Sequence, residues 1–165
     1  MITNGVSLLR LAPIKNMLTT KEKANGVSHG LSEAGYDIRI AQDISFDPGA
    51  HGGYPTVDNG DGGRIGRFVL ASAIEEFDMP DSHMAIVHDK STWARQGLSV
   101  FNTVIEPGWK GFLTLELVFH GNVPVHIPAG SGIAQVIFHG LFRDARYEGK
   151  YQDQENRPVP SRFEK

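Results

Sequence analysis

Glycine and proline residues break the apolar segments of this chain into short runs along its whole length. The 165 residues include 19 glycines and 9 prolines, and turn signals such as Asp47-Pro48-Gly49, Asn59-Gly60-Asp61-Gly62-Gly63 and Pro128-Ala129-Gly130 separate the apolar runs. Such runs suit strands joined by tight turns better than they suit packed helices. The pattern therefore predicts a single all-β domain, either a sandwich or a barrel.

The apolar alternation also indicates where the elements lie. We expect strands at residues 35–41, 67–72, 84–87, 98–105, 112–119, 123–127 and 133–139. A helical turn is predicted at 91–96, with Ser91 or Thr92 as N-cap and Gly97 closing it, and a second short helix at 19–24. Residues 144–165 are polar, and their apolar residues follow neither the period of a strand nor that of a helix. Taken alone, this favours a disordered tail.

The composition excludes several classes of protein. Because the chain has no cysteine, it can form neither a disulfide framework nor the Cys-containing zinc site of the metal-dependent base deaminases. The seven histidines are scattered and show no metal-binding spacing. A formal net charge of −3 gives no support to general nucleic-acid binding. No apolar stretch approaches the roughly 18 residues of a membrane span and no signal peptide is recognisable, so we expect a cytoplasmic protein.

One carboxylate stands in the middle of an apolar strand, in the segment FLTLELVF at residues 112–119. Strand alternation puts the three leucines and Phe119 on one face and Glu116 on the other. A lone carboxylate among apolar neighbours costs free energy unless it is paired. Glu116 is therefore ion-paired or exposed at a sheet edge, or it is a general acid or base with a raised pKa.

Two cations and a hydroxyl lie within the short segment Asp89-Lys90-Ser91-Thr92-Trp93-Ala94-Arg95. If Ser91 opens a helical turn, the backbone N–H groups and the positive end of the turn face outward. Lys90 adds a charge, and Arg95 returns to the face of Ser91. The turn is either an anion site for phosphates or a capped surface turn with solvated charges.

Two further pairs of residues allow both a structural and a functional interpretation. Glu106 and Trp109 flank a Pro-Gly corner at the end of a strand. They are either a turn residue and a packing aromatic, or part of a functional site on a loop. Asp37 and Arg39 share one face of a short strand, where a salt bridge with each other or with a neighbouring strand is the favoured role.

These segments occur together in the order found in the dCTP deaminases, and the chain resembles that family from about Gly35 to its C-terminus. AGYDIRI is similar to the family's Tyr-Asp-Leu-Arg strand, and EEFDMPDSHMAIVHDKSTWAR to its Met-Pro loop, strand and Ser-Ser-Leu-Ala-Arg turn. IEPGWKGFLTLEL is similar to its Asp-Pro-Gly-Trp-x-Gly segment and catalytic Leu-Glu, and YEGKYQDQENRPVPSR to its Lys-Tyr-x-x-Gln lid. The trimeric dUTPases are a more distant resemblance.

The resemblance implies a homotrimer of distorted β-barrels of the dUTPase-like, jelly-roll type, with active sites shared between neighbouring subunits. It implies zinc-free hydrolysis of dCTP to dUTP and ammonia, with Glu116 as general base and Ser91 and Arg95 positioning the water and stabilising charge. Residues 144–165 would form a lid over the nucleotide, with Mg2+ bound through the phosphate oxygens. The implied substrate-binding residues are Lys90, Ser91, Glu106, Trp109, Tyr147, Lys150 and Gln154.

Two departures from the family concern the substrate. Between Arg95 and Glu106 the chain is two residues shorter than typical dCTP deaminases. A difference of two residues keeps the same side chains on each face of the strands, but it alters the loop that shapes the base pocket. Glu106 stands where dUTPases and bifunctional members carry an Asp that activates water, and its extra methylene disfavours cleavage to dUMP. The alternatives are a bifunctional enzyme, a dUTPase and a non-catalytic nucleotide-binding regulator.

Overall fold

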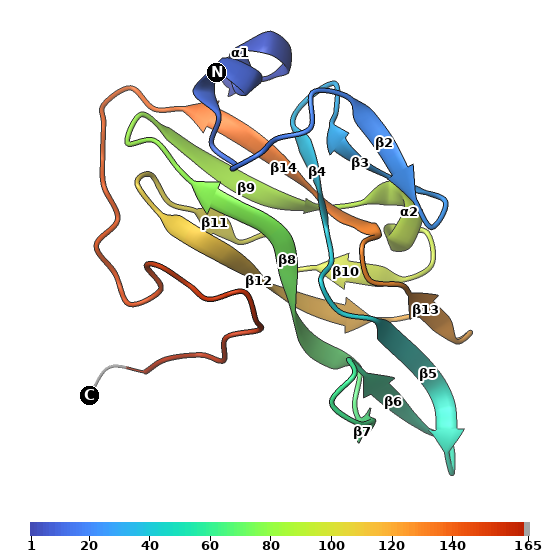
Figure 1. Cartoon of the computed structure of the whole chain (residues 1–165). Coiled ribbons are helices and arrows are strands. Elements are labelled where there is room, and N and C mark those ends of the chain that lie inside the picture. The colour runs from blue at the N-terminus through green and yellow to red at the C-terminus, as the bar shows by residue number, and fades with distance from the viewer. Residues whose placement is uncertain (164–165) are drawn as a thin grey trace.

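The computed structural model describes residues 1–163, apart from the side chains of residues 50 and 51, and its regular secondary structure is mainly strands (Figure 1). The helices are α1 (Gly5–Leu11) and α2 (Ser91–Ala94). The strands are β1 (Ile2–Thr3), β2 (Lys21–Ala24), β3 (Val27–Leu31), β4 (Tyr36–Arg39), β5 (Ile44–His51), β6 (Tyr54–Asp58), β7 (Arg64–Ile65), β8 (Phe68–Asp78), β9 (His83–Asp89), β10 (Leu98–Val100), β11 (Val104–Ile105), β12 (Lys110–Phe119), β13 (Val125–Ile127) and β14 (Gly132–Gly140). The all-β prediction is confirmed.

The strands form three antiparallel sheets. The largest has the order β11-β9-β14-β4-β3-β2, with β1 also paired to β14. A second has the order β10-β12-β8, and a third the order β13-β5-β6-β7. Over the described residues the sheets do not close into a barrel, because strands such as β11 and β2 end their sheet with a partner on one side only. Of the expected distorted barrel of the jelly-roll type, the antiparallel β-sheets are present, but within residues 1–163 they do not form a closed barrel.

Strand β12 divides the molecule into a core side and a cavity side. Leu115 and Leu117 are fully buried, and Phe119 stacks on Phe46 with ring centroids 5.1 Å apart, whereas Thr114 and Glu116 on the other face are partly exposed. The predicted alternation is confirmed.

Two of the predicted elements are wrong. The segment expected as a helix at 19–24 contains strand β2, which pairs with β3 from Lys21↔Gly30 to Ala24↔Val27. A helix of so few residues is marginal on its own, so pairing with a neighbouring strand overrides its propensity. The Asp47-Pro48-Gly49 turn lies inside β5, where the pairing with β6 shifts register. Helix α1 was not predicted.

The strand predicted at 98–105 is divided between two sheets. Its first part, β10, pairs with β12, and its last part, β11, pairs with β9. Between them the backbone turns sharply, and the Thr103 N–H donates to the Phe101 carbonyl at 2.8 Å. The strand is interrupted here because it changes partners, and Thr103 of the connection lines the same cavity as Glu116.

Helix α2 is held to the large sheet by two buried contacts. The Lys90 ammonium lies 2.6 Å from the Asp37 carboxylate, with only 9% and 5% of the two side chains exposed. The Trp93 indole N–H donates to the Gly132 carbonyl at 2.7 Å. Lys90 is the N-cap and no side chain caps the helix, so the predicted Ser91 or Thr92 cap is wrong, although the turn closes at Gly97 with φ of 93°.

The predicted structural role of Asp37 and Arg39 is confirmed, with partners outside their own strand. Asp37 pairs with Lys90, and the Arg39 guanidinium pairs with Glu75 of β8 at 2.8 Å. Glu75 also accepts the backbone N–H of Arg39 at 2.8 Å. Strand β4 thus anchors both α2 and the neighbouring sheet.

We expect Asp37→Asn to lower the free energy of unfolding by about 3 kcal/mol, because it leaves the Lys90 ammonium buried without an anionic partner. Urea unfolding measures the loss. The control Glu76→Gln removes an exposed ion pair with Lys15 and should cost less than about 1 kcal/mol. Equal losses for the two variants would contradict the anchoring role of the Asp37–Lys90 pair.

Candidate active site

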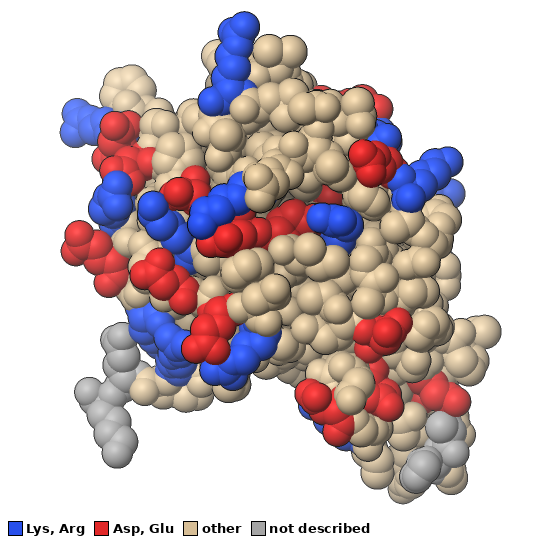
Figure 2. All heavy atoms as spheres, viewed as in Figure 1, with Lys and Arg blue, Asp and Glu red and all other residues tan. Residues whose placement is uncertain are grey.

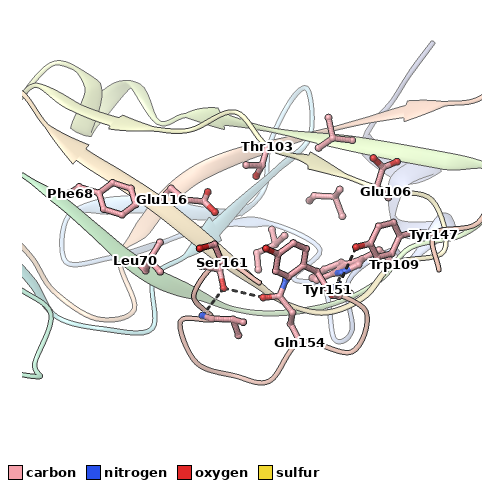
Figure 3. Close-up of a pocket in the computed structure, with 15 residues that line it drawn as sticks. Phe68, Leu70, Thr103, Glu106, Trp109, Glu116, Tyr147, Tyr151, Gln154 and Ser161 are labelled. Atoms are coloured by element: carbon pink, nitrogen blue, oxygen red, sulfur yellow. Dashed lines mark hydrogen bonds between the residues drawn. The ribbon is translucent and has the colours of Figure 1, made fainter. Parts of the chain in front are cut away.

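A cavity of about 480 Å³ lies between β12, the β10–β11 connection and the C-terminal segment (Figure 3). Its volume is within the range of small-molecule sites. Its walls are mainly apolar, and its polar groups are a few carboxylate, hydroxyl and amide side chains. The lining residues are Phe68, Leu70, Thr103, Val104, Ile105, Glu106, Trp109, Leu113, Thr114, Glu116, Tyr147, Tyr151, Gln154, Val159 and Ser161.

The cavity brings together five of the residues singled out from the sequence: Glu106, Trp109, Glu116, Tyr147 and Gln154. The other four, Lys90, Ser91, Arg95 and Lys150, are not among its lining residues. Figure 1 shows α2, which carries Ser91, at the end of β9 away from the C-terminal segment. A phosphate-binding role for Lys90 would compete with its buried pairing to Asp37.

Glu116 is half-buried on the cavity side of β12, and its carboxylate points into the cavity (Figure 3). Oxygen Oε2 is buried and accepts no hydrogen bond from any described residue. Burial raises the pKa of the Glu116 carboxyl above its ordinary value of 4.5, because desolvation disfavours the charged form. The carboxylate is thus suited to accept a proton from a molecule that enters the cavity.

The C-terminal segment closes the other side of the cavity, from Tyr147 to Ser161. It has no regular structure but is hydrogen-bonded to Trp109 and to the start of β12, which follows it. The Trp109 indole N–H donates to the Tyr151 carbonyl at 2.6 Å, and the Phe112 N–H donates to the Gln154 carbonyl at 3.1 Å. Through residue 163, the segment therefore follows a defined path, unlike the disordered tail that its composition favours; residues 164 and 165 of the predicted lid lie outside the described residues.

Gly111 makes this close approach possible. Its φ is 125°, and a Cβ atom there would lie 2.5 Å from the Gln154 backbone nitrogen. Side chains are excluded both by the backbone conformation and by the neighbouring segment. The glycine in the Trp-Lys-Gly stretch thus lets the C-terminal segment lie directly on β12.

Basic side chains lie among acidic ones where the C-terminal segment lies (Figure 2). Lys150 and Arg162 lie over the Tyr151 ring, at 5.5 and 6.0 Å from its centroid. The Arg162 guanidinium also donates to the Lys150 carbonyl at 2.7 Å, which holds the two cations near each other. Lys150 and Arg162, beside the cavity residue Tyr151, are suited to contact an anionic part of a ligand.

Sequence reasoning missed several cavity residues. Thr114 lies two positions before Glu116 on the same strand, so the period of two could have identified it. Phe68 and Leu70 lie opposite Val118 and Glu116 on β8, a pairing that no local signal gives. Val159 and Ser161 belong to the irregular segment, whose path depends on tertiary contacts.

The described residues contain no cluster of three or more His, Asp or Glu side chains that could hold a metal ion by themselves. Glu106 is a single exposed carboxylate at the cavity. Mg2+ is commonly held by one or two carboxylates together with substrate phosphates and waters. The donor set therefore fits a magnesium ion carried mainly by a ligand's phosphates. In the described part of the chain, no helix is long and apolar enough to cross a membrane.

We expect Glu116→Gln to stabilise the protein near pH 8 but not near pH 4. The raised pKa means that the protonated carboxyl favours folding; this contribution is fully present below about pH 4.5 and is lost as the pH rises through the folded-state pKa. Glutamine does not ionise and avoids that loss. Urea unfolding at both pH values measures the difference.

Glu33→Gln is the control, because the pKa shift of Glu33 has the opposite sign: Lys21 lowers the pKa of that exposed carboxyl. It should not stabilise the protein near pH 8. A Glu116→Gln variant that is no more stable than the wild type near pH 8 would show that burial does not penalise the charged carboxylate.

Comparison with known proteins identifies the family. A family model described as dCTP deaminase-like matches residues 56–141. The dCTP deaminase of Campylobacter curvus is 36% identical over 153 residues, which cover 81% of each chain. The solved dCTP deaminase from Agrobacterium tumefaciens has a TM-score of 0.57 at 16% identity, over 83% of this chain and 47% of that one, and the EIAV dUTPase has a TM-score of 0.52 at 18% identity, over 91% and 97%. These two structures share the fold, and the sequence relatives show that the chain belongs to the dCTP deaminase family.

Proposed function

We propose that this protein is a dCTP deaminase that hydrolyses dCTP to dUTP and ammonia without zinc. The observation that carries the proposal is the Glu116 carboxylate, which faces the cavity with one buried and unpartnered oxygen. An unpaired, desolvated carboxylate costs stability, and a proton-transfer role accounts for it. As an enzyme of nucleotide metabolism, the protein is expected to act in the cytoplasm.

In the proposed reaction, Glu116 moves protons between water and the cytosine ring. It accepts a proton from water as the water oxygen attacks C4, and it passes this proton to N3. It then takes the proton of the new hydroxyl group at C4 and gives it to the amino nitrogen. The C4–N bond breaks, ammonia leaves with the electron pair, and the C4 carbonyl of dUTP forms. A raised pKa favours this cycle because the carboxyl binds and releases protons nearer neutral pH.

We further propose a homotrimer in which Ser91 and Arg95 reach each site from a neighbouring subunit. In their own chain neither residue lines the cavity that contains Glu116. The cavity mouth and its surroundings also expose apolar side chains: Phe68 is 45% exposed, Phe101 51% and Val104 49%. Exposed apolar groups that lie together are typical of a surface covered by another chain. In the assembled site, Ser91 would position the attacking water and Arg95 would stabilise the changing charge.

The triphosphate would lie toward the C-terminal segment, which we propose as a lid spanning residues 144–165. Tyr147, Lys150 and Gln154 would hold the nucleotide from this lid, and Glu106 and Trp109 from the corner before β12. Lys90, beside Ser91 of the neighbouring subunit, would contribute by exchanging its buried pairing to Asp37 for a phosphate oxygen. Mg2+, bound through the phosphate oxygens, would neutralise part of their charge.

We expect the wild type to release ammonia from dCTP and to leave the dUTP intact. Glu116→Gln should still bind dCTP but lose at least about 100-fold in turnover, because the amide cannot accept the proton. Ion-exchange separation of nucleotides and pyrophosphate, with Mg2+ present, measures both products. Release of pyrophosphate with dUMP would instead favour the bifunctional alternative through Glu106, and consumption of dUTP alone would favour a dUTPase. Tight nucleotide binding without any product would favour the regulator.

Mixed oligomers test the shared site. Arg95→Ala and Glu116→Gln chains should each be nearly inactive, but oligomers reassembled from both should regain activity. Some sites would then combine the intact Glu116 of one chain with the intact Arg95 of the other. A mixture as inactive as its components would exclude the sharing of these two residues. A chain that carries both substitutions, mixed with Glu116→Gln, is the control that should remain inactive.

A further inference from the structure

Backbone hydrogen bonds hold the C-terminal segment to the start of β12, and two further hydrogen bonds, closer to Glu116, both use the hydroxyl of Thr114. The hydroxyl donates to the Gln154 side-chain oxygen at 3.1 Å and accepts the Val159 backbone N–H at 3.0 Å (Figure 3). From this geometry we propose that Thr114 is a positioning residue that fixes the C-terminal segment and the Gln154 amide over the cavity of its own chain. The proposal rests on the deaminase function proposed above.

The hydroxyl suits this role because it both donates and accepts. Val159 can only donate its backbone N–H, so Thr114 must accept that bond. The hydroxyl proton is then available for Gln154, which presents its amide oxygen to Thr114. The Gln154 amide nitrogen is thereby turned away from Thr114, and its N–H groups are oriented to donate to an acceptor atom of a bound nucleotide. Thr114 would thus determine that Gln154 acts as a donor.

Thr114 contacts the segment at two points, through the Gln154 side chain and the Val159 backbone. Val159 is only 6% exposed, so its backbone bond to Thr114 is shielded from water. Before this contact, the backbone of Gln154 lies on Gly111, where β12 and the C-terminal segment form a parallel β-bridge. Because Thr114 and Glu116 share one face of β12, a change in the segment's position is also a change in its position relative to the Glu116 carboxylate.

Thr114→Val removes the hydroxyl at nearly constant volume and tests the proposal directly. We expect its KM for dCTP to rise about tenfold while kcat changes much less, because loosening the segment weakens nucleotide binding rather than proton transfer. Thr114→Ser keeps the hydroxyl and should restore the KM of the wild type. Thr56→Val, in strand β6 of the third sheet, is the matched control and should leave both constants unchanged.

Limited trypsin digestion supplies a readout that needs no substrate. The bonds after Lys150 and Arg162 lie in the segment, whereas Arg64 lies in β7 and provides an internal reference. In Thr114→Val, cleavage after Lys150 and Arg162 should accelerate about tenfold relative to cleavage after Arg64. Thr114→Ser and Thr56→Val should cleave as the wild type does.

The outcomes separate this proposal from the proposed function. Segment cleavage in Thr114→Val at the wild-type rate, or a Thr114→Ser variant as impaired as Thr114→Val, would overturn the role of the hydroxyl. A fall in kcat with KM unchanged would also overturn it. If the wild type releases no ammonia from dCTP, the deaminase proposal fails, and the cleavage rates still decide whether Thr114 anchors the segment.

Discussion

Strand β12 has two chemically different faces, and the core and the candidate site depend on that difference. One face buries Leu115 and Leu117 against the core, so the register of the strand is strongly specified. A shift of one residue would move the leucines to the cavity and the Glu116 carboxylate into the core. The core side of the strand therefore fixes the position of Glu116.

The unpaired carboxylate is tolerated because its surroundings are only partly dry. Glu116 is half-buried and keeps some contact with solvent through the cavity, so burial raises its pKa without expelling the charge altogether. The buried charges elsewhere are handled differently, since Lys90 and Asp37 neutralise each other. A structural ion pair and a candidate catalytic group thus differ in whether a partner is supplied within the chain.

Much of the fold could be predicted from the sequence where the signal is local. The alternation in β12, the turn closed at Gly97 and the structural role of Asp37 and Arg39 all follow from patterns of neighbouring residues. The partners of those two residues could not be predicted, because Lys90 and Glu75 lie 53 and 36 positions away. The β2 segment was misassigned for the same reason, since its partner strand decides its conformation.

In the candidate site, too, local patterns identify some residues and cannot identify others. Glu116 could be identified as a carboxylate on the non-core face of an apolar strand. Thr114 and Val159 could not be linked, because their contact spans 45 positions and involves a segment with no periodic pattern. The resemblance to a family supplied the lid, while the hydrogen bonds that hold it were visible only in the structure.

Strand β14 has three partners, β1, β4 and β9, and lies late in the chain. During synthesis, β4 and β9 emerge long before the strand that pairs with both of them. The three-stranded sheet can assemble once residue 119 is available, but the large sheet must wait for residue 140. Until then, the edges of β1, β4 and β9 that pair with β14 lack their native neighbour, and unpaired edges favour association between chains. The growing chain is therefore more exposed to aggregation than the finished protein.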